Sequence, residues 1–259
     1  MNSPREITFF GANYRIAQFI HEQYPVVRIV CERRAFNIDL HNFALLNDIE
    51  FMLVEKRADL RELPSAEGSL GISCGFGIIF KKKVIDKFEL GIWNIHYGKL
   101  PDIRGRHPIS WAFLRSDKEF FVSIHEIDEE IDQGYLLAQG SVRRSLTDTQ
   151  EEIEHKIEQL LSDSLLKTAF ENAMSGNRTP LGEGTYYENL AHKFDEVQPD
   201  RFDSVFMFNL FKSQAVYGGV RINGERYREC AFYHEDFPSL FSDYRVFTCN
   251  DGHKIAVRK

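Results

Sequence analysis

Hydrophobic residues along the first half of the chain fall into short runs separated by helical patterns. Four apolar runs have the length and flanks of buried strands: residues 7–11, 26–31, 50–54 and 69–74. Apolar residues at helical spacing follow the first two runs, around residues 16–20 and 40–46. Strands that alternate with helices in this way indicate a mostly parallel sheet with helices on both faces. The pattern therefore predicts an α/β, Rossmann-like fold.

The pattern continues with three more strands and one long helix. The strands are expected at residues 90–96, 120–125 and 134–139. The helix is expected over residues 147–174, because one apolar stripe runs along it and Thr149 and Glu152 have the spacing of a capping box. Gly176 and Asn177 then end it.

The last part of the chain changes character. Residues 177–200 are rich in Gly, Asn and Pro, which is typical of a linking arm. Short apolar runs flank the Asn223-Gly224 hairpin signal and predict a small antiparallel unit. We therefore expect a catalytic domain over residues 1–200 and a C-terminal β subdomain over residues 201–259. Unpaired strands in that subdomain make a homodimer the expected assembly.

Composition narrows the class of protein. Hydrophobic residues make up 43% of the chain and charged residues 27%, and the formal net charge is −7. These values are typical of a soluble globular protein, and the negative charge disfavours a general nucleic-acid surface. No apolar run is long enough to span a membrane, and the first residues lack the apolar segment of a signal peptide. The four cysteines are far apart and form no CxxC pair, as in a protein with free thiols. We expect a cytoplasmic protein.

Phosphate-binding signals are weak. Residues 11–13 hold one glycine where a dinucleotide fingerprint needs three, which disfavours a nicotinamide cofactor. Gly75-Phe76-Gly77 does not continue into a Gly-Lys-Ser/Thr phosphate loop. The lysines at 81–83 are better explained as the solvated first turn of a helix than as phosphate contacts.

Four polar residues stand at or near the ends of predicted strands: Asn94, His96, His125 and Asp132. Ligands of open α/β sheets bind beyond the carboxyl ends of the strands. Alternation along a strand places Asn94 and His96 on the same side of the backbone. A structural histidine and a zinc site are the competing interpretations, but Asn is a poor zinc ligand and no HxH or HxxxH pair is present. No metal is expected.

These residue types suit acyl transfer to an amine. An imidazole accepts a proton near neutral pH, and an Asn amide donates to a developing oxyanion. A neighbouring carboxylate orients the imidazole and stabilises its charge. Direct transfer between two bound substrates is expected, rather than a covalent intermediate.

The motifs around these residues resemble those of the folate-dependent formyltransferases. The resemblance rests on four elements in order: Asn94-Ile95-His96, Leu100-Pro101-x-x-Arg104-Gly105, His125 and Ile131-Asp132-x-Gly134. It implies N10-formyltetrahydrofolate as the co-substrate and Asn94, His96 and Asp132 as the catalytic residues. It also implies a set of folate contacts, namely Phe76, Gly77, Ile78, Ile79, Leu90, Ile127 and Asp128. His125 matches a histidine that only some members carry.

The acceptor has to be chosen within that family. Glycinamide ribonucleotide formyltransferases are usually shorter, and methionyl-tRNA formyltransferases are longer and favour a basic face. This acidic chain with its small β unit is most similar to bacterial sugar N-formyltransferases, which formylate nucleotide-linked amino-dideoxy sugars for lipopolysaccharide O-antigen. A dTDP-linked sugar is the expected acceptor, with contacts from Tyr97, Arg104, Gly105, Trp111 and His125. Formyl transfer to methionyl-tRNA or glycinamide ribonucleotide, a formyltetrahydrofolate hydrolase and a silent binding module remain as alternatives.

Overall fold

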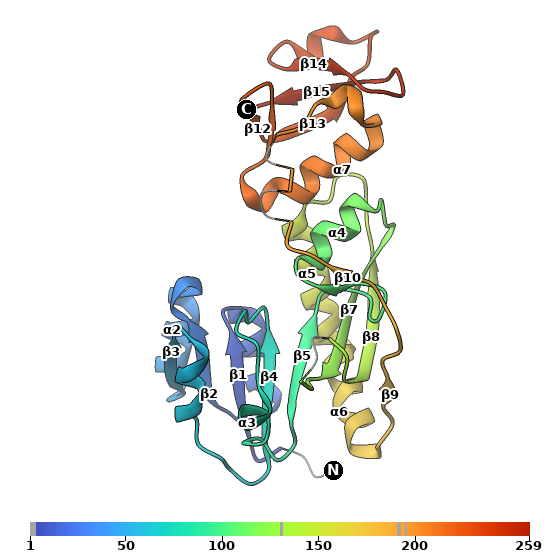
Figure 1. The fold of residues 1–259 in the computed structure, drawn as a ribbon. Coiled ribbons are helices and arrows are strands. Elements are labelled where there is room, and N and C mark those ends of the chain that lie inside the picture. Colours follow the sequence, from blue (N-terminus) through green and yellow to red (C-terminus); the bar gives the residue numbers. More distant parts are fainter. Residues whose placement is uncertain (1–3, 130–131, 191–192, 195) are drawn as a thin grey trace. The chain divides into compact units, whose positions relative to one another are not determined.

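The computed structural model describes residues 4–129, 132–190, 193–194 and 196–259, and the chain divides into two compact units. The first consists of Met1–Arg104, Phe121–Val142 and His155–Tyr186. The second consists of Gly105–Phe120, Arg143–Glu154 and Tyr187–Lys259. A functional boundary at residue 200 stays a prediction. Figure 1 follows the chain through both units.

A mixed sheet organises the first unit (Figure 1). Within the described residues its strand order is β3-β2-β1-β4-β5-β7-β8-β9. The strands are β1 (Glu6–Gly11), β2 (Val26–Glu32), β3 (Glu50–Val54), β4 (Ser69–Cys74), β5 (Ile92–His96), β7 (Glu119–Glu126), β8 (Tyr135–Arg143) and β9 (Thr179–Pro180). The first five pair in parallel, whereas β7 runs antiparallel to β5. The predicted α/β fold with a mostly parallel sheet is confirmed.

Helices begin where the sequence supplies side-chain caps. Asn13 and Asn37 accept backbone hydrogen bonds at the starts of α1 (Tyr14–Gln23) and α2 (Ile38–Leu46). Short turns follow β2 and β3, at Arg33–Ala35 and Arg57–Glu62, and α3 (Lys82–Ile85) follows β4.

The predicted long helix is present with one irregularity. It consists of α5 (Gln150–Leu160), a π-helical turn (Leu161–Leu165) and α6 (Leu166–Ser175). The capping box forms, because Glu152 N donates to Thr149 Oγ1 (3.2 Å) and Thr149 N donates to Glu152 Oε2 (2.7 Å). Gly176 ends the helix with φ of 72°, a conformation that favours glycine. The π-helical turn was not predicted.

The predicted linking arm forms two short strands. Besides β9, which pairs with β8, it contains β10 (Tyr186–Tyr187), which pairs with β6 (Arg104–Gly105). Backbone bonds from Arg104 N to Thr185 O and from Arg106 N to Tyr187 O accompany this pairing.

The second unit combines helices with two small sheets. It contains α4 (Pro108–Leu114), α7 (Ser204–Gln214), the hairpin of β11 (Val220–Ile222) and β12 (Glu225–Tyr227), and a sheet of β13 (Glu229–Phe232), β15 (Lys254–Arg258) and β14 (Arg245–Thr248). Short 3₁₀ turns lie at Pro199–Arg201, Ala215–Tyr217 and Pro238–Phe241. The antiparallel C-terminal sheets confirm the predicted fold class.

One element of the C-terminal part, α7, was not predicted. Its sequence, SVFMFNLFKSQ, is apolar on several sides, so it lacks the one-sided stripe by which a helix is recognised. Met207, Leu210 and Phe211 are nearly fully buried in the core of the second unit. No described helix in either unit is long and apolar enough to cross a membrane.

Candidate active site

Strand register brings the candidate residues together at the middle of the sheet. Ser73 on β4 lies opposite Asn94 on β5, and Asn94 lies opposite His125 on β7. Because neighbouring strands are about 5 Å apart, the three side chains form a row across the sheet. The register of the antiparallel pairing creates this row, since it places His125, near the end of β7, level with Ser73, near the end of β4.

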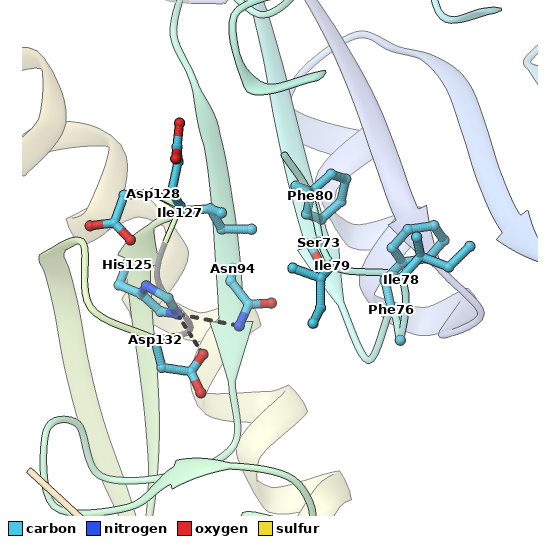
Figure 2. Close-up of a pocket in the computed structure, with 12 residues that line it drawn as sticks. Ser73, Phe76, Ile78, Ile79, Phe80, Asn94, His125, Ile127, Asp128 and Asp132 are labelled. Atoms are coloured by element: carbon cyan, nitrogen blue, oxygen red, sulfur yellow. Dashed lines mark hydrogen bonds and ion pairs between the residues drawn. The ribbon is translucent and has the colours of Figure 1, made fainter. Parts of the chain in front are cut away.

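A pocket opens beside this row, entirely within the first unit (Figure 2). One wall is the loop after β4, and the other is formed by β5, β7 and the loop that follows β7. The lining residues are Ser73, Phe76, Gly77, Ile78, Ile79, Phe80, Asn94, His125, Ile127, Asp128, Glu129 and Asp132. The pocket therefore combines an apolar loop with a polar row, as ligand sites usually do.

Asn94 and His125 hold each other in one orientation (Figure 2). His125 Nδ1 lies 3.0 Å from the carbonyl oxygen of Glu126, and a carbonyl only accepts, so this nitrogen carries the hydrogen. In the neutral ring Nε2 is then an acceptor, and Asn94 Nδ2 donates to it at 3.3 Å. The amide of Asn94 keeps a second N–H that a ligand in the pocket can accept.

His96 is fixed in the opposite tautomer. Its Nε2 lies 2.7 Å from the carbonyl oxygen of Ile103 and therefore donates to it. The lone pair of the neutral ring is then on Nδ1, which lies 3.9 Å from Asp132 Oδ2. Asp132 also lies near the other ring, with Oδ1 3.5 Å from His125 Nε2. One carboxylate thus faces both histidines.

Burial sets the charge state of His96. The ring is 6% exposed, and this desolvation lowers the pKa of His96 below its ordinary value of 6.5. The Asp132 carboxylate opposes the shift and raises the pKa, His125 lowers it further, and the bond to the Ile103 carbonyl raises it. Since burial dominates, His96 is neutral at pH 7 and has a nitrogen free to accept a proton.

A buried network holds the loop that carries Ile103. Ser123 on β7 donates to Gly98 O at 2.7 Å and accepts from Leu100 N at 3.2 Å. Gln139 on β8 donates to Ser123 Oγ and to Leu100 O. The sequence did not indicate these contacts, nor the carbonyl of Ile103. The only sequence signal was the Leu-Pro motif itself, which marks a loop but not what the loop holds.

Most of the residues expected to contact folate line this pocket. Phe76, Gly77, Ile78 and Ile79 form one wall, and Ile127 and Asp128 lie on the other. Leu90 is not among the lining residues; its backbone N–H donates to Ser69 O before β5 begins. Ser73, Phe80 and Glu129 line the pocket without having been predicted. Ile131 of the motif lies outside the described residues.

The residues expected to contact the acceptor are distributed over both units. His125 lines the pocket, and Tyr97 follows β5, where its hydroxyl accepts from Cys74 Sγ at 3.9 Å. Arg104 is buried, and its guanidinium donates to Gly182 O at 2.5 Å. Gly105 and Trp111 belong to the second unit, in which Trp111 Nε1 donates to Glu188 O and its ring lies 4.8 Å from that of Tyr187. Their roles stay predictions.

The fold and the Asn-His-Asp group define the class of protein. A mixed α/β sheet that presents Asn94, His96 and Asp132 beside a pocket is the arrangement expected for a formyl-transferring enzyme. Residues 43–169 match the family model described as formyl transferase. Over these residues the chain belongs to the formyl transferase family.

Comparison with sequence relatives gives distant matches. The chain is 26% identical over 214 residues to a methionyl-tRNA formyltransferase of Prochlorococcus marinus (strain AS9601). That alignment covers 73% of this chain and 65% of the relative, so the chain spans less than two thirds of the relative's length.

Solved structures resemble the chain over its full length. WlaRD, a sugar 3N-formyl transferase solved in the presence of dTDP and 5-N-formyl-THF, matches with a TM-score of 0.74 and 22% identity, covering 100% of this chain and 98% of that one. An N-formyltransferase from Helicobacter canadensis, in complex with folinic acid and dTDP-3-aminofucose, matches with a TM-score of 0.72 and 19% identity, covering 98% of both chains. At these identities the likeness establishes the formyltransferase fold.

Proposed function

We propose that this protein is an N-formyltransferase that transfers a formyl group from N10-formyltetrahydrofolate to the amine of a nucleotide-linked amino sugar. The observation that carries the reaction is the group of Asn94, His96 and Asp132 beside one pocket, in which His96 and Asp132 are buried. The expected setting is cytoplasmic synthesis of a surface polysaccharide by a homodimer. The proposed mechanism uses no metal.

Asn94 stabilises the charge that develops on the formyl oxygen. Its amide is held by His125, and its second N–H is available to that oxygen. A pre-oriented donor needs no rearrangement as charge develops, and one such donor is worth roughly 10²–10³-fold in turnover.

His96 accepts the proton that the attacking amine loses. The acceptor atom is Nδ1, because Nε2 already donates to Ile103 O. Once Nδ1 is protonated, it gains the Asp132 carboxylate as a partner. The amine attacks the formyl carbon, the bond from that carbon to the folate nitrogen breaks, and that nitrogen receives a proton.

The folate is proposed to lie in the pocket. Main chain of Phe76, Gly77, Ile78 and Ile79 on one side, and Ile127 and Asp128 on the other, would hold its ring system. The neighbours solved with formyl-THF or folinic acid support this choice of co-substrate.

The sugar acceptor is supported by the extent of the structural likeness. WlaRD and the Helicobacter canadensis enzyme match this chain from end to end, whereas the chain spans only part of the methionyl-tRNA enzyme. The net charge of −7 also disfavours tRNA as the acceptor. A dTDP-linked sugar is the first candidate, with Tyr97, Arg104, Gly105 and Trp111 as its proposed contacts.

The test is formyl transfer from N10-formyltetrahydrofolate to a panel of dTDP-, UDP- and GDP-linked amino sugars, followed by mass spectrometry. We expect one dTDP-linked sugar to gain a formyl group. The variant His96→Asn should lose roughly 10²–10⁴-fold in turnover, since it removes the general base. Formylation of methionyl-tRNA or glycinamide ribonucleotide instead of any sugar would reject the acceptor. Formate release without an acceptor would indicate the hydrolase.

A further inference from the structure

A buried carboxylate stands behind the pocket loop, outside the catalytic group. Glu32 is the last residue of β2 and is 6% exposed. Its Oε1 accepts from the backbone N–H of Gly77 at 2.6 Å. Its Oε2 accepts from Arg34 Nε at 2.9 Å and lies 2.7 Å from Arg34 Nη2. A buried carboxylate is costly unless it is paired, and here both oxygens have partners.

The loop after β4 packs closely against Glu32 and Arg34 at Gly77. A Cβ added at Gly77 would lie 2.4 Å from Arg34 Nη2 and 3.0 Å from Glu32 Oε1. The first atom that such a Cβ meets is therefore the end of the exposed Arg34 side chain, which a small side chain at position 77 would displace before the carboxylate.

Other contacts hold the rest of the loop. Arg57 Nε donates to Ile79 O at 3.1 Å. The rings of Phe76 and Phe80 pack against Phe10, with centroids 5.5 and 4.9 Å away. Glu32 thus makes a buried polar contact at the middle of the loop, whereas apolar packing fixes the two ends of the loop. Gly77, Ile78 and Ile79 lie between those ends and line the pocket. Figure 2 shows Ile78 and Ile79 on this loop.

We propose that Glu32 is a positioning residue for folate binding: its carboxylate holds the Gly77 N–H so that the loop is already in its binding shape before the ligand arrives. This inference rests on the proposed function, because it assumes that the pocket takes the folate. Pre-organisation of a loop lowers the cost of binding, so its loss appears in affinity. Glu32 touches no reacting atom, and turnover at saturation should change little.

The experiment measures the Kd of folinic acid by calorimetry, together with kcat and KM for N10-formyltetrahydrofolate and the acceptor. For Glu32→Ala we expect Kd and KM for the folate to rise roughly 10-fold, because the Gly77 N–H loses its buried acceptor. The kcat and the KM for the acceptor should stay within about threefold. Glu32→Gln should keep most of the affinity, since the amide oxygen can still accept from Gly77.

Two further variants separate positioning from general stability. Glu32→Met should raise the folate Kd as Glu32→Ala does, because it fills similar space but removes the carboxylate that accepts from the Gly77 N–H. Glu50→Ala is the matched control, because Glu50 is an ion-paired carboxylate on neighbouring β3, 2.7 Å from Arg28, with no contact to the loop. It should leave the folate Kd unchanged.

A folate Kd that stays within twofold in both Glu32→Ala and Glu32→Met would overturn the role of Glu32 while leaving the proposed function intact. If Glu32→Ala does not fold, Glu32→Met alone decides in the same way. Because folinic acid binding needs no acceptor, failure to find a sugar substrate does not affect this comparison. Failure of the unaltered protein to bind folinic acid would overturn the folate site and this role together.

Discussion

Individual atoms of the active site have assigned roles because their neighbours leave one arrangement of hydrogens. The carbonyl oxygens of Ile103 and Glu126 can only accept, so each fixes which nitrogen of His96 or His125 carries the hydrogen. The free nitrogen of His96 faces Asp132, and that of His125 faces Asn94. The proposed base and the proposed oxyanion donor are therefore both oriented before substrate binds.

The pH dependence of Asp132→Asn tests this arrangement. His96 must be neutral to accept a proton, so activity falls as the pH drops through its pKa, which burial places below 6.5. The Asp132 carboxylate raises that pKa, so its removal leaves burial unopposed and lowers it further. We expect kcat to fall roughly 10²–10⁴-fold and the acidic limb of kcat/KM to move to lower pH.

The measurement is kcat/KM from about pH 4.5 to 8.5. Asp86→Asn serves as the control, because Asp86 is an exposed carboxylate whose partner is Lys82. An acidic limb that stays in place or moves to higher pH in Asp132→Asn would contradict the assignment of His96 as the base.

At the scale of elements, the close approach of two strands sets the position of Asp132. Gly134 is buried just before β8, and a Cβ there would lie 1.9 Å from Glu126 O at the end of β7. Arg178 also forms an ion pair with Glu126: Arg178 Nη1 donates to the two carboxylate oxygens of Glu126 at 3.0 and 3.1 Å. The end of β7 and the start of β8 thus lie close together on either side of Asp132.

Gly134→Ala is expected to reduce kcat roughly 10²-fold, because the strand ends must separate and move Asp132 away from the histidines. Overpacking of this kind also costs about 1–3 kcal/mol of stability. Kinetics and thermal unfolding of the purified variant test both effects. Gly182→Ala should be neutral, since a Cβ there meets no atom within 4 Å. Unchanged turnover in Gly134→Ala would show that the close approach of Gly134 to the Glu126 carbonyl is not required for activity.

At the scale of the whole molecule, the pocket and its catalytic residues belong to one compact unit. All lining residues lie within Met1–Arg104 and Phe121–Val142. The second unit has its own core around Met207, Leu210 and Val220. A ligand of the pocket should therefore stabilise the first unit directly.

Folinic acid at about 100 times its Kd should stabilise the first unit by about 2.7 kcal/mol. This corresponds to a rise in Tm of roughly 5–10 °C for a unit of this size. Scanning calorimetry with and without folinic acid measures the shift. The His96→Asn variant should show the same rise, because His96 is not among the residues that line the pocket. No shift in the unaltered protein at saturation would contradict folate binding in this pocket.

The sequence by itself determined the local elements and the residue types on which the proposed chemistry rests. The strands, the long capped helix and the Asn94-x-His96 pair are encoded within a few neighbouring residues, because periodicity and capping are local properties. Helix α7 was not predicted, since a helix that is buried on several sides has no single apolar stripe by which it can be recognised.

Only the tertiary structure decided how distant segments meet. The antiparallel entry of β7 places His125 against Asn94, although 31 positions separate them in the chain. Glu32 reaches Gly77 across 45 positions, and the Ile103 carbonyl selects the tautomer of His96. These contacts depend on strand register and loop closure between remote segments, for which a single sequence carries no local signal.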